Sequence, residues 1–136
     1  MNTEMPSGRK TSILIADDDA NLRKLILTTL DFGIYDIRTA NTGLNALEIA
    51  REFRPEIVLL DLIMPGMGGL EVCKHLRADA NQMHTYILLI TGHDPAQLHL
   101  NVSESGANGL ILKPFSPLEL IKHIEDRPQQ SSPEVT

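Results

Sequence analysis

The stretch IVLLDLIMPGMGG, residues 57–69, decides the fold. Its first four residues are all apolar, which is typical of a strand that is covered on both faces of a parallel sheet. Asp61 follows directly, and Pro65 with the glycines after it predicts a sharp loop before a helix. In an open parallel sheet, ligands bind outside the carboxyl ends of the strands. The stretch therefore predicts a buried strand that presents a carboxylate where ligands bind.

Further segments on both sides of this stretch have the length of a strand. Two of them, ILIA and ILLI, are as apolar as residues 57–60, and segments of helical spacing lie between the strands. This alternation is typical of repeated βα units around a parallel sheet. The expected strands are residues 12–16, 35–39, 56–60, 86–90 and 109–112.

The first two helices have recognisable ends. The first is expected near Ala20, with Asp19 as its N-cap, because a carboxylate accepts hydrogen bonds from the free N–H groups there. The second is expected from Thr42 to Phe53, and Pro55 stops it. The first helix should turn one apolar face toward the sheet. This face is expected to consist of Leu22, Leu25, Ile26 and Leu30.

The sequence marks the remaining helices with different clarity. The third is expected after the glycines at 68 and 69. The fourth follows Asp94, in a segment that alternates like a strand as much as it repeats like a helix. The fifth has Ser116 as N-cap, Pro117 in its first turn and Glu119 in a capping box.

Length and charge limit the class of protein. A chain of 136 residues fits one domain, and its formal charge of −6 argues against binding to nucleic acid or an anionic membrane. Cys73 is the only cysteine, and no apolar run approaches the roughly 20 residues that cross a bilayer. We expect a cytoplasmic protein with a flexible segment over residues 1–11, a folded domain over 12–126 and a flexible tail or linker over 127–136.

Polar side chains follow the expected strands where each one ends. They are Asp17, Asp18 and Asp19 after the first strand, Asp61 after the third, Thr91 after the fourth and Lys113 after the fifth. An isolated aspartate triple is explained most simply as a solvated helix start. Together with Asp61 and Lys113, however, it favours a site. Clustered carboxylates repel one another, and a hard cation such as Mg²⁺ relieves that repulsion by taking their oxygens as ligands.

This set resembles the response-regulator receiver family of two-component signalling. The match consists of Asp17 and Asp18 after ILIA, Asp61 within VLLDLIMPGMGG, Thr91 within ILLITG, and Lys113 within LILKPF. The four motifs occur in the family's order and with its spacing over residues 12–126. The resemblance implies a flavodoxin-like, doubly wound α/β fold, with a five-stranded parallel sheet of order 2-1-3-4-5 and five helices on two faces.

The resemblance also implies a function. Asp61 is expected to accept a phosphoryl group from a histidine kinase or a histidine phosphotransfer protein, with Thr91 and Lys113 contacting the group. The chain would then be a bacterial phosphoacceptor module rather than an enzyme, which switches an output surface and allows a phosphorylation-dependent dimer. Its metal would be Mg²⁺ or Mn²⁺. The expected ligands are Asp17, Asp18, Asp61 and the backbone carbonyl of Ile63.

Two alternatives stay open at this point. One is a receiver-like interaction module that is not phosphorylated in practice. The other is a phosphatase of the haloacid dehalogenase type, with Asp17 as nucleophile and Asp19 as general acid, although Asn21 stands where that family prefers a threonine. The sequence also departs from the receiver pattern at Leu110, where the family commonly has an aromatic residue that turns inward on phosphorylation. The usual aromatic signal is therefore expected to be absent or to be carried by other groups.

Overall fold

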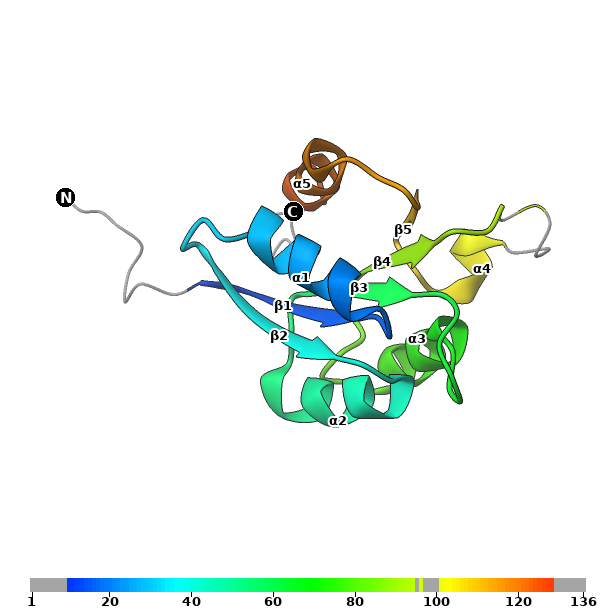
Figure 1. Ribbon diagram of the computed structural model, residues 1–136. Helices are drawn as coiled ribbons and strands as arrows, with labels where there is room; N and C mark the ends of the chain where they lie inside the picture. The colour runs from blue at the N-terminus through cyan, green and yellow to red at the C-terminus, as the bar shows by residue number, and fades with distance from the viewer. Residues whose placement is uncertain (1–9, 95, 97–100, 129–136) are drawn as a thin grey trace.

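The computed structural model describes residues 10–94, 96 and 101–128, and its centre is a parallel sheet (Figure 1). The strand order is β2-β1-β3-β4-β5, which confirms the predicted topology. The predicted bounds differ by one residue at the ends of several strands. For example, β3 starts one residue later than expected and includes Asp61 as its last residue. The strands are β1 (Thr11–Ala16), β2 (Tyr35–Ala40), β3 (Ile57–Asp61), β4 (Tyr86–Thr91) and β5 (Gly109–Leu112).

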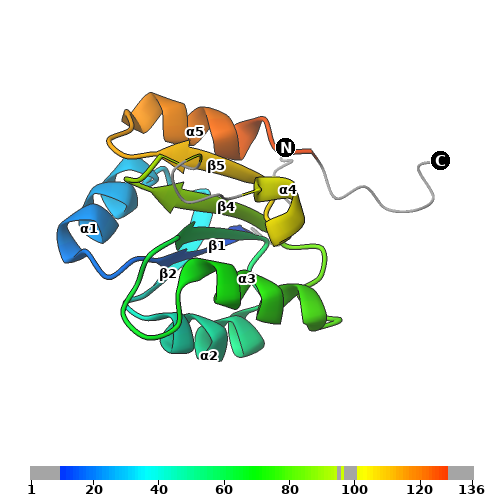
Figure 2. The same cartoon turned by 90° about the vertical axis from the view of Figure 1, so that its right-hand side faces the viewer.

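Helices cover both faces of the sheet, as the doubly wound fold requires (Figures 1 and 2). They are α1 (Ala20–Thr29), α2 (Gly43–Phe53), α3 (Gly69–Ala78), α4 (Val102–Ser105) and α5 (Pro117–Glu125). The helices α1 and α5 lie on one face, and α2, α3 and the single turn of α4 lie on the other. The segment before α4, residues 97–100, and most of the segments predicted to be flexible lie outside the described residues.

Helix caps follow the predicted chemistry. Asp19 is the N-cap of α1, and its Oδ1 accepts hydrogen bonds from the backbone N–H groups of Asn21 and Leu22. Ser116 is the N-cap of α5, and its side chain accepts from the N–H of Glu119. Both N-cap predictions are confirmed.

The core consists of two apolar layers, one on each face of the sheet. The central strands β1, β3 and β4 contribute alternate residues to the two layers, so nearly every position along them is buried. This explains why their sequences lack the polar alternation of a half-exposed strand. One prediction about this core is wrong, because Leu25 is 45% exposed. In α1 only Ile26 is fully buried, with Leu22 beside it, and Leu25 lies on the flank of that stripe.

Arg77, near the end of α3, forms hydrogen bonds with the two segments that lead into β4 and β5. The Nε of Arg77 donates to the carbonyl of Gly106 at 2.7 Å, and its Nη2 donates to Oδ1 of Asn108 at 2.8 Å. Its Nη1 donates to the carbonyls of Met83 and Thr85 at 2.9 and 2.7 Å. We call these five residues the Arg77 clamp. It lies at the amino ends of the strands, opposite the edge where the aspartates gather.

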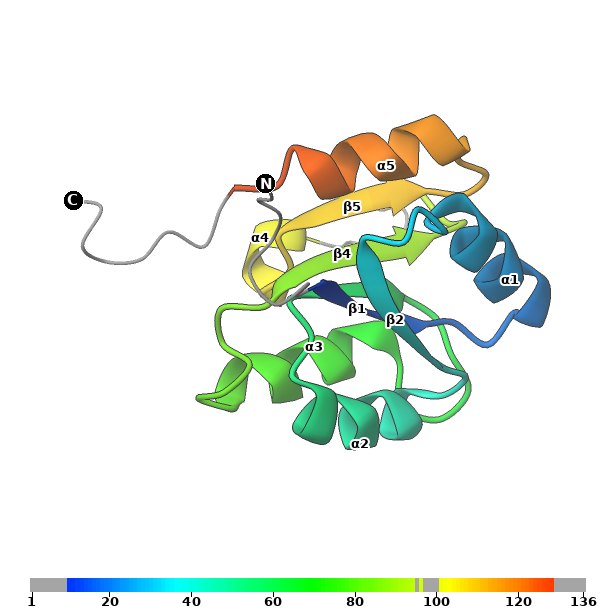
Figure 3. The ribbon, with the colours of Figure 1, turned by 90° about the vertical axis from the view of Figure 1, so that its left-hand side faces the viewer.

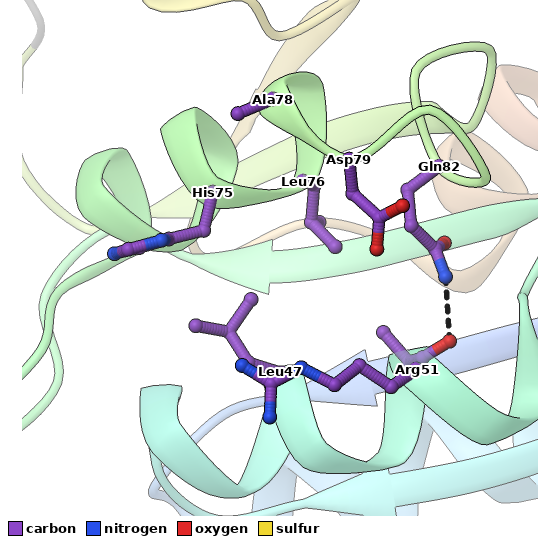
Figure 4. A pocket seen from close by; sticks show the side chains of 8 residues that line it. Leu47, Arg51, His75, Leu76, Ala78, Asp79 and Gln82 are labelled. Carbon is purple, nitrogen blue, oxygen red and sulfur yellow. Dashed lines mark hydrogen bonds between the residues drawn. The ribbon is translucent and has the colours of Figure 1, made fainter.

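A second contact at this end joins α2 to the loop after α3 (Figure 4). The amide of Gln82 is buried, and its Nε2 donates to the carbonyl of Ala50 at 2.6 Å. A small pocket lies beside this bond and is lined by Leu47 and Arg51 from α2 and by His75 and Asp79 around α3. Gln82 therefore links the C-terminal part of α2 to the loop that follows α3.

Among the described residues, no helix has the length and apolar composition needed to cross a bilayer.

Candidate functional site at the carboxyl edge of the sheet

Three carboxylates meet at the carboxyl ends of β1 and β3. Asp17 and Asp18 directly follow β1, and Asp61 is the last residue of β3, which pairs with β1. An oxygen from each side chain lies within 4.8 Å of an oxygen from the other two. Asp17 and Asp61 are buried, at 1% and 5% exposure, whereas Asp18 faces solvent. The sequence prediction that these residues share one edge is therefore confirmed by their geometry.

Lys113 forms ion pairs with two carboxylates of this cluster. It follows β5, and its Nζ lies 3.3 Å from Oδ2 of Asp17 and 3.6 Å from Oδ2 of Asp61. Its backbone N–H donates to the carbonyl of Thr91 at 2.8 Å, which holds the start of the β5–α5 loop against β4. The peptide bond between Lys113 and Pro114 is cis. One ammonium thus faces two buried carboxylates, so the cluster carries excess negative charge.

The excess negative charge of the cluster affects the pKa of Asp61. Burial, with the neighbouring charge of Asp17, raises the pKa of Asp61 from 3.8 to about 6, although Lys113 and the N–H of Ile63 act in the opposite direction. That N–H lies 3.3 Å from Oδ1 of Asp61. Because the raised pKa reflects unfavourable burial of the charged form, a cation bound at the cluster would favour the ionised carboxylate.

One buried oxygen of the cluster has no hydrogen-bond partner among the described residues. Oδ1 of Asp17 accepts a hydrogen bond from the N–H of Asp19 at 2.8 Å, but Oδ2 is buried without one and lies 3.3 Å from the ammonium of Lys113. A buried carboxylate oxygen left in this way is costly unless a cation compensates it. Carboxylate oxygens are the ligands that Mg²⁺ prefers, so the donor set fits a hard divalent metal ion.

Thr91 lies at the same edge of the sheet as the carboxylates. It is the last residue of β4, it is 1% exposed, and β4 pairs with β3 so that Ile90 lies opposite Asp61. The Oγ1 of Thr91 accepts a hydrogen bond from the N–H of His93 at 3.0 Å. The loop after β4 therefore holds this hydroxyl at the same edge as Asp61 and Lys113.

The loop after Asp61 is packed too closely to admit a side chain at one point. A Cβ on Gly69 would collide with the carbonyl oxygen of Asp61, and the N–H of Gly69 donates to the carbonyl of Leu62 at 2.8 Å. Gly66 has a φ of +76°, which L residues rarely adopt. The side chain of Ile63 is half exposed in this loop. The predicted ligand role of its carbonyl stays a prediction.

Sequence reasoning missed one residue that supports the cluster. The Nη1 of Arg23 donates to the backbone carbonyl of Asp17 at 2.6 Å, so a side chain of α1 fixes the backbone directly after β1. The sequence did contain a sign of this contact. Arg23 lies near the beginning of α1, where a cation interacts unfavourably with the helix dipole, so its presence there suggests a contact elsewhere. Side chains of a helix lean toward its N-terminus, which is the direction in which Arg23 reaches Asp17.

The raised pKa of Asp61 predicts an unusual pH dependence in Mg²⁺-free buffer. The folded chain keeps a proton on Asp61 up to pH about 6, whereas the unfolded chain loses it near 3.8. Its contribution to the free energy of unfolding is therefore fully present below pH about 4 and is lost as the pH rises to about 6. We expect the urea midpoint of the parent to fall over this range relative to Asp61→Asn, which has no proton to lose. Parallel curves for the two proteins would contradict this.

Comparison with known proteins gives the same assignment as the site. A family model described as response regulator receiver domain matches residues 13–125. The DNA-binding response regulator MtrA of Mycobacterium tuberculosis is 38% identical over 122 residues, which cover 90% of this chain and 52% of MtrA. Response regulator MprA of Mycobacterium leprae is 34% identical, with 90% and 53% covered. The chain therefore spans about half the length of the curated relatives it matches.

Solved structures are similar over nearly their full length. The chemotaxis response regulator CheY4 of Vibrio cholerae superimposes with a TM-score of 0.79 and 30% identity, covering 86% of this chain and 98% of that one. The BeF3-activated DrrB receiver domain gives a TM-score of 0.76 and 26% identity, with 86% and 96% covered. With its acidic cluster and Lys113 at the edge where the fold places its chemistry, the chain belongs to the family of response regulator receiver domains.

Proposed function

We propose that Asp61 accepts a phosphoryl group from a histidine kinase or a histidine phosphotransfer protein, and that this event switches an output surface. The observation that carries the proposal is the position of Asp61, which is buried at a strand end with Lys113 Nζ at 3.6 Å and two further carboxylates beside it. A buried carboxylate in such a place is costly, and the cost is understandable if the group reacts.

In the proposed step, a carboxylate oxygen of Asp61 attacks the phosphorus atom of a phosphohistidine. The P–N bond breaks, and the imidazole keeps the bonding electron pair. Lys113 pairs its ammonium with a phosphoryl oxygen in place of Asp61, and the hydroxyl of Thr91 donates to another. Positioning and charge neutralisation supply most of the rate enhancement in phosphoryl transfer.

We further propose that the acidic cluster binds Mg²⁺ or Mn²⁺. The ligands would be carboxylate oxygens of Asp17, Asp18 and Asp61 with the carbonyl oxygen of Ile63, and the bound ion would neutralise charge on the phosphoryl oxygens. The donor set supports this, because Oδ2 of Asp17 is buried without a hydrogen bond and the carboxylates lie within 4.8 Å of one another.

The other two functions have less support. In the phosphatase alternative Asp19 is the general acid, but its carboxylate caps α1 by accepting two backbone hydrogen bonds. The interaction-module alternative does not explain why three carboxylates and the ammonium of Lys113 lie together at one edge of the sheet. We place the chain in the cytoplasm, where a kinase of two-component signalling would meet it. We expect its formal charge of −6 to disfavour binding of this chain to nucleic acid.

The metal proposal is tested by heat unfolding with and without Mg²⁺. We expect Mg²⁺ at about ten times its dissociation constant to stabilise the parent by about 1.4 kcal/mol, which raises the midpoint by a few degrees. Asp18→Asn should lose most of this shift. Asp19→Asn is the matched control, since it removes the same charge from the same triple while asparagine caps a helix equally well. Equal shifts in both variants would count against the site.

A further inference from the structure

β2 forms an edge of the sheet, and among residues 10–94, 96 and 101–128 it pairs only with β1 (Figure 3). Exposure alternates along it, so that Asp36 and Arg38 are exposed while Tyr35, Ile37 and Thr39 are half-buried. The unpaired edge of a strand is a template on which another strand can form. The charges along β2 indicate which strand fits.

The hydrogen bonds to β1 decide which residues of β2 face outward. The carbonyl of Ile34 accepts from the N–H of Thr11 at 3.3 Å, and that of Ala40 accepts from Asp17 at 3.1 Å. Because the bonding direction alternates along a strand, the even-numbered residues of β2 direct their backbone groups toward β1. The N–H and C=O groups of the odd-numbered residues therefore point away from the sheet. These residues are Tyr35, Ile37 and Thr39.

This parity and the charges together leave one register in which two copies of β2 match fully. In an antiparallel pair about a two-fold axis at Ile37, Tyr35 of each copy lies opposite Thr39 of the other, and all three positions present outward backbone groups. Asp36 of each copy then lies opposite Arg38 of the other, in the pairs whose side chains approach most closely. An axis at Asp36 or Arg38 would place two like charges directly opposite one another. An axis at Tyr35 or Thr39 would leave these charge pairs unformed.

We propose that β2 is an interface between two copies of this chain, which pair antiparallel about Ile37 and join their sheets into one. Arg38 is prepared for this contact, because its guanidinium already stacks on the ring of Phe53 at 4.2 Å and loses less freedom on pairing. Phe32 and Ile34, at 55% and 54% exposure, precede the strand and would be partly covered. The pairing needs no phosphoryl group and is independent of the function proposed for Asp61.

The interface is expected to be weak and transient. A single strand added at an edge buries less than the roughly 1,000 Å² that a stable interface requires. Sedimentation of the full chain from about 10 μM to about 1 mM should therefore show a mass that rises with concentration toward that of a dimer. Asp36→Arg and Arg38→Asp should each abolish the rise, because each places like charges opposite one another.

Two further experiments, a double variant and a mixture of the two single variants, separate strand pairing from general charge effects. The double swap of both residues keeps the net charge of −6 and restores opposite charges across the axis, so it should recover the dimer. An equimolar mixture of the two single variants should form a heterodimer for the same reason. A parent that stays monomeric at about 1 mM, or a folded double swap that does not recover, overturns the proposal.

Amide hydrogen exchange gives a second readout at the backbone. Protection of the Tyr35, Ile37 and Thr39 amides should increase with protein concentration, in parallel with the sedimentation result. If these amides are equally protected at all concentrations, a segment of the same chain covers the edge, and the second copy is excluded as its occupant.

Discussion

The Asp61→Asn chain is expected to take up no phosphoryl group from acetyl phosphate and Mg²⁺, whereas the parent takes up one. An amide is a far weaker nucleophile than a carboxylate and cannot form the acyl phosphate, so the rate should fall at least about 10³-fold. Intact mass spectrometry of the two proteins under identical conditions measures the difference directly. Asp19→Asn serves as the control for loss of one acidic residue near the site, and it should be phosphorylated like the parent.

Folding of the Asp61→Asn chain is not expected to limit this test. The substitution keeps the shape of the side chain and removes a charge whose burial is unfavourable, so the unfolding midpoint should not fall below that of the parent. If the variant still gains a single phosphoryl group, and peptide mapping places it on Asp17, the phosphatase alternative would be correct and the proposed acceptor wrong.

Arg77→Met is expected to lower the free energy of unfolding by about 3–4 kcal/mol, which is large for one residue. The methionine fills much of the same space but leaves the part-buried carbonyls of Gly106 and Thr85 without this donor, and each such unsatisfied group costs about 1–3 kcal/mol. The carbonyl of Met83 is exposed and can bond to water instead. Arg77→Lys should recover only part of the loss, because an ammonium cannot reproduce the planar fork of donors.

Urea unfolding measures this effect, and α2 offers a matched control. Arg51 is an exposed arginine near the end of that helix, and replacing it with methionine should change the free energy by no more than about 0.5 kcal/mol. If Arg77→Met and Arg51→Met destabilise the chain equally, the Arg77 clamp does not carry the stability assigned to it.

The site was predictable because its residues follow uninterrupted apolar strands. Asp17, Asp61 and Thr91 each come directly after such a run, and a parallel sheet brings these positions to one edge. The N-caps were predictable for a similar reason, because a cap and the N–H groups that donate to it are only two or three residues apart. Local pattern is sufficient wherever the topology itself, or a single turn of chain, brings the groups together.

Contacts between distant backbone groups were not predictable in this way. The acceptors of Arg77 lie between 6 and 31 residues from it, and three of them are carbonyls, which every residue possesses. No side-chain pattern marks such a partner. Leu25 was assigned to the wrong side of its helix because a leucine on the flank of an apolar stripe has the same spacing as one inside it.

The Arg77 clamp also has a consequence for how the molecule opens. The guanidinium of Arg77 on α3 satisfies groups in two other segments, so a fluctuation that exposes the turn at Gly106 must also release the loop before β4. These segments therefore share one cooperative opening reaction, with a free energy above that of isolated loops. We therefore expect the amino edge of the sheet to open less readily than loops that no such contact joins.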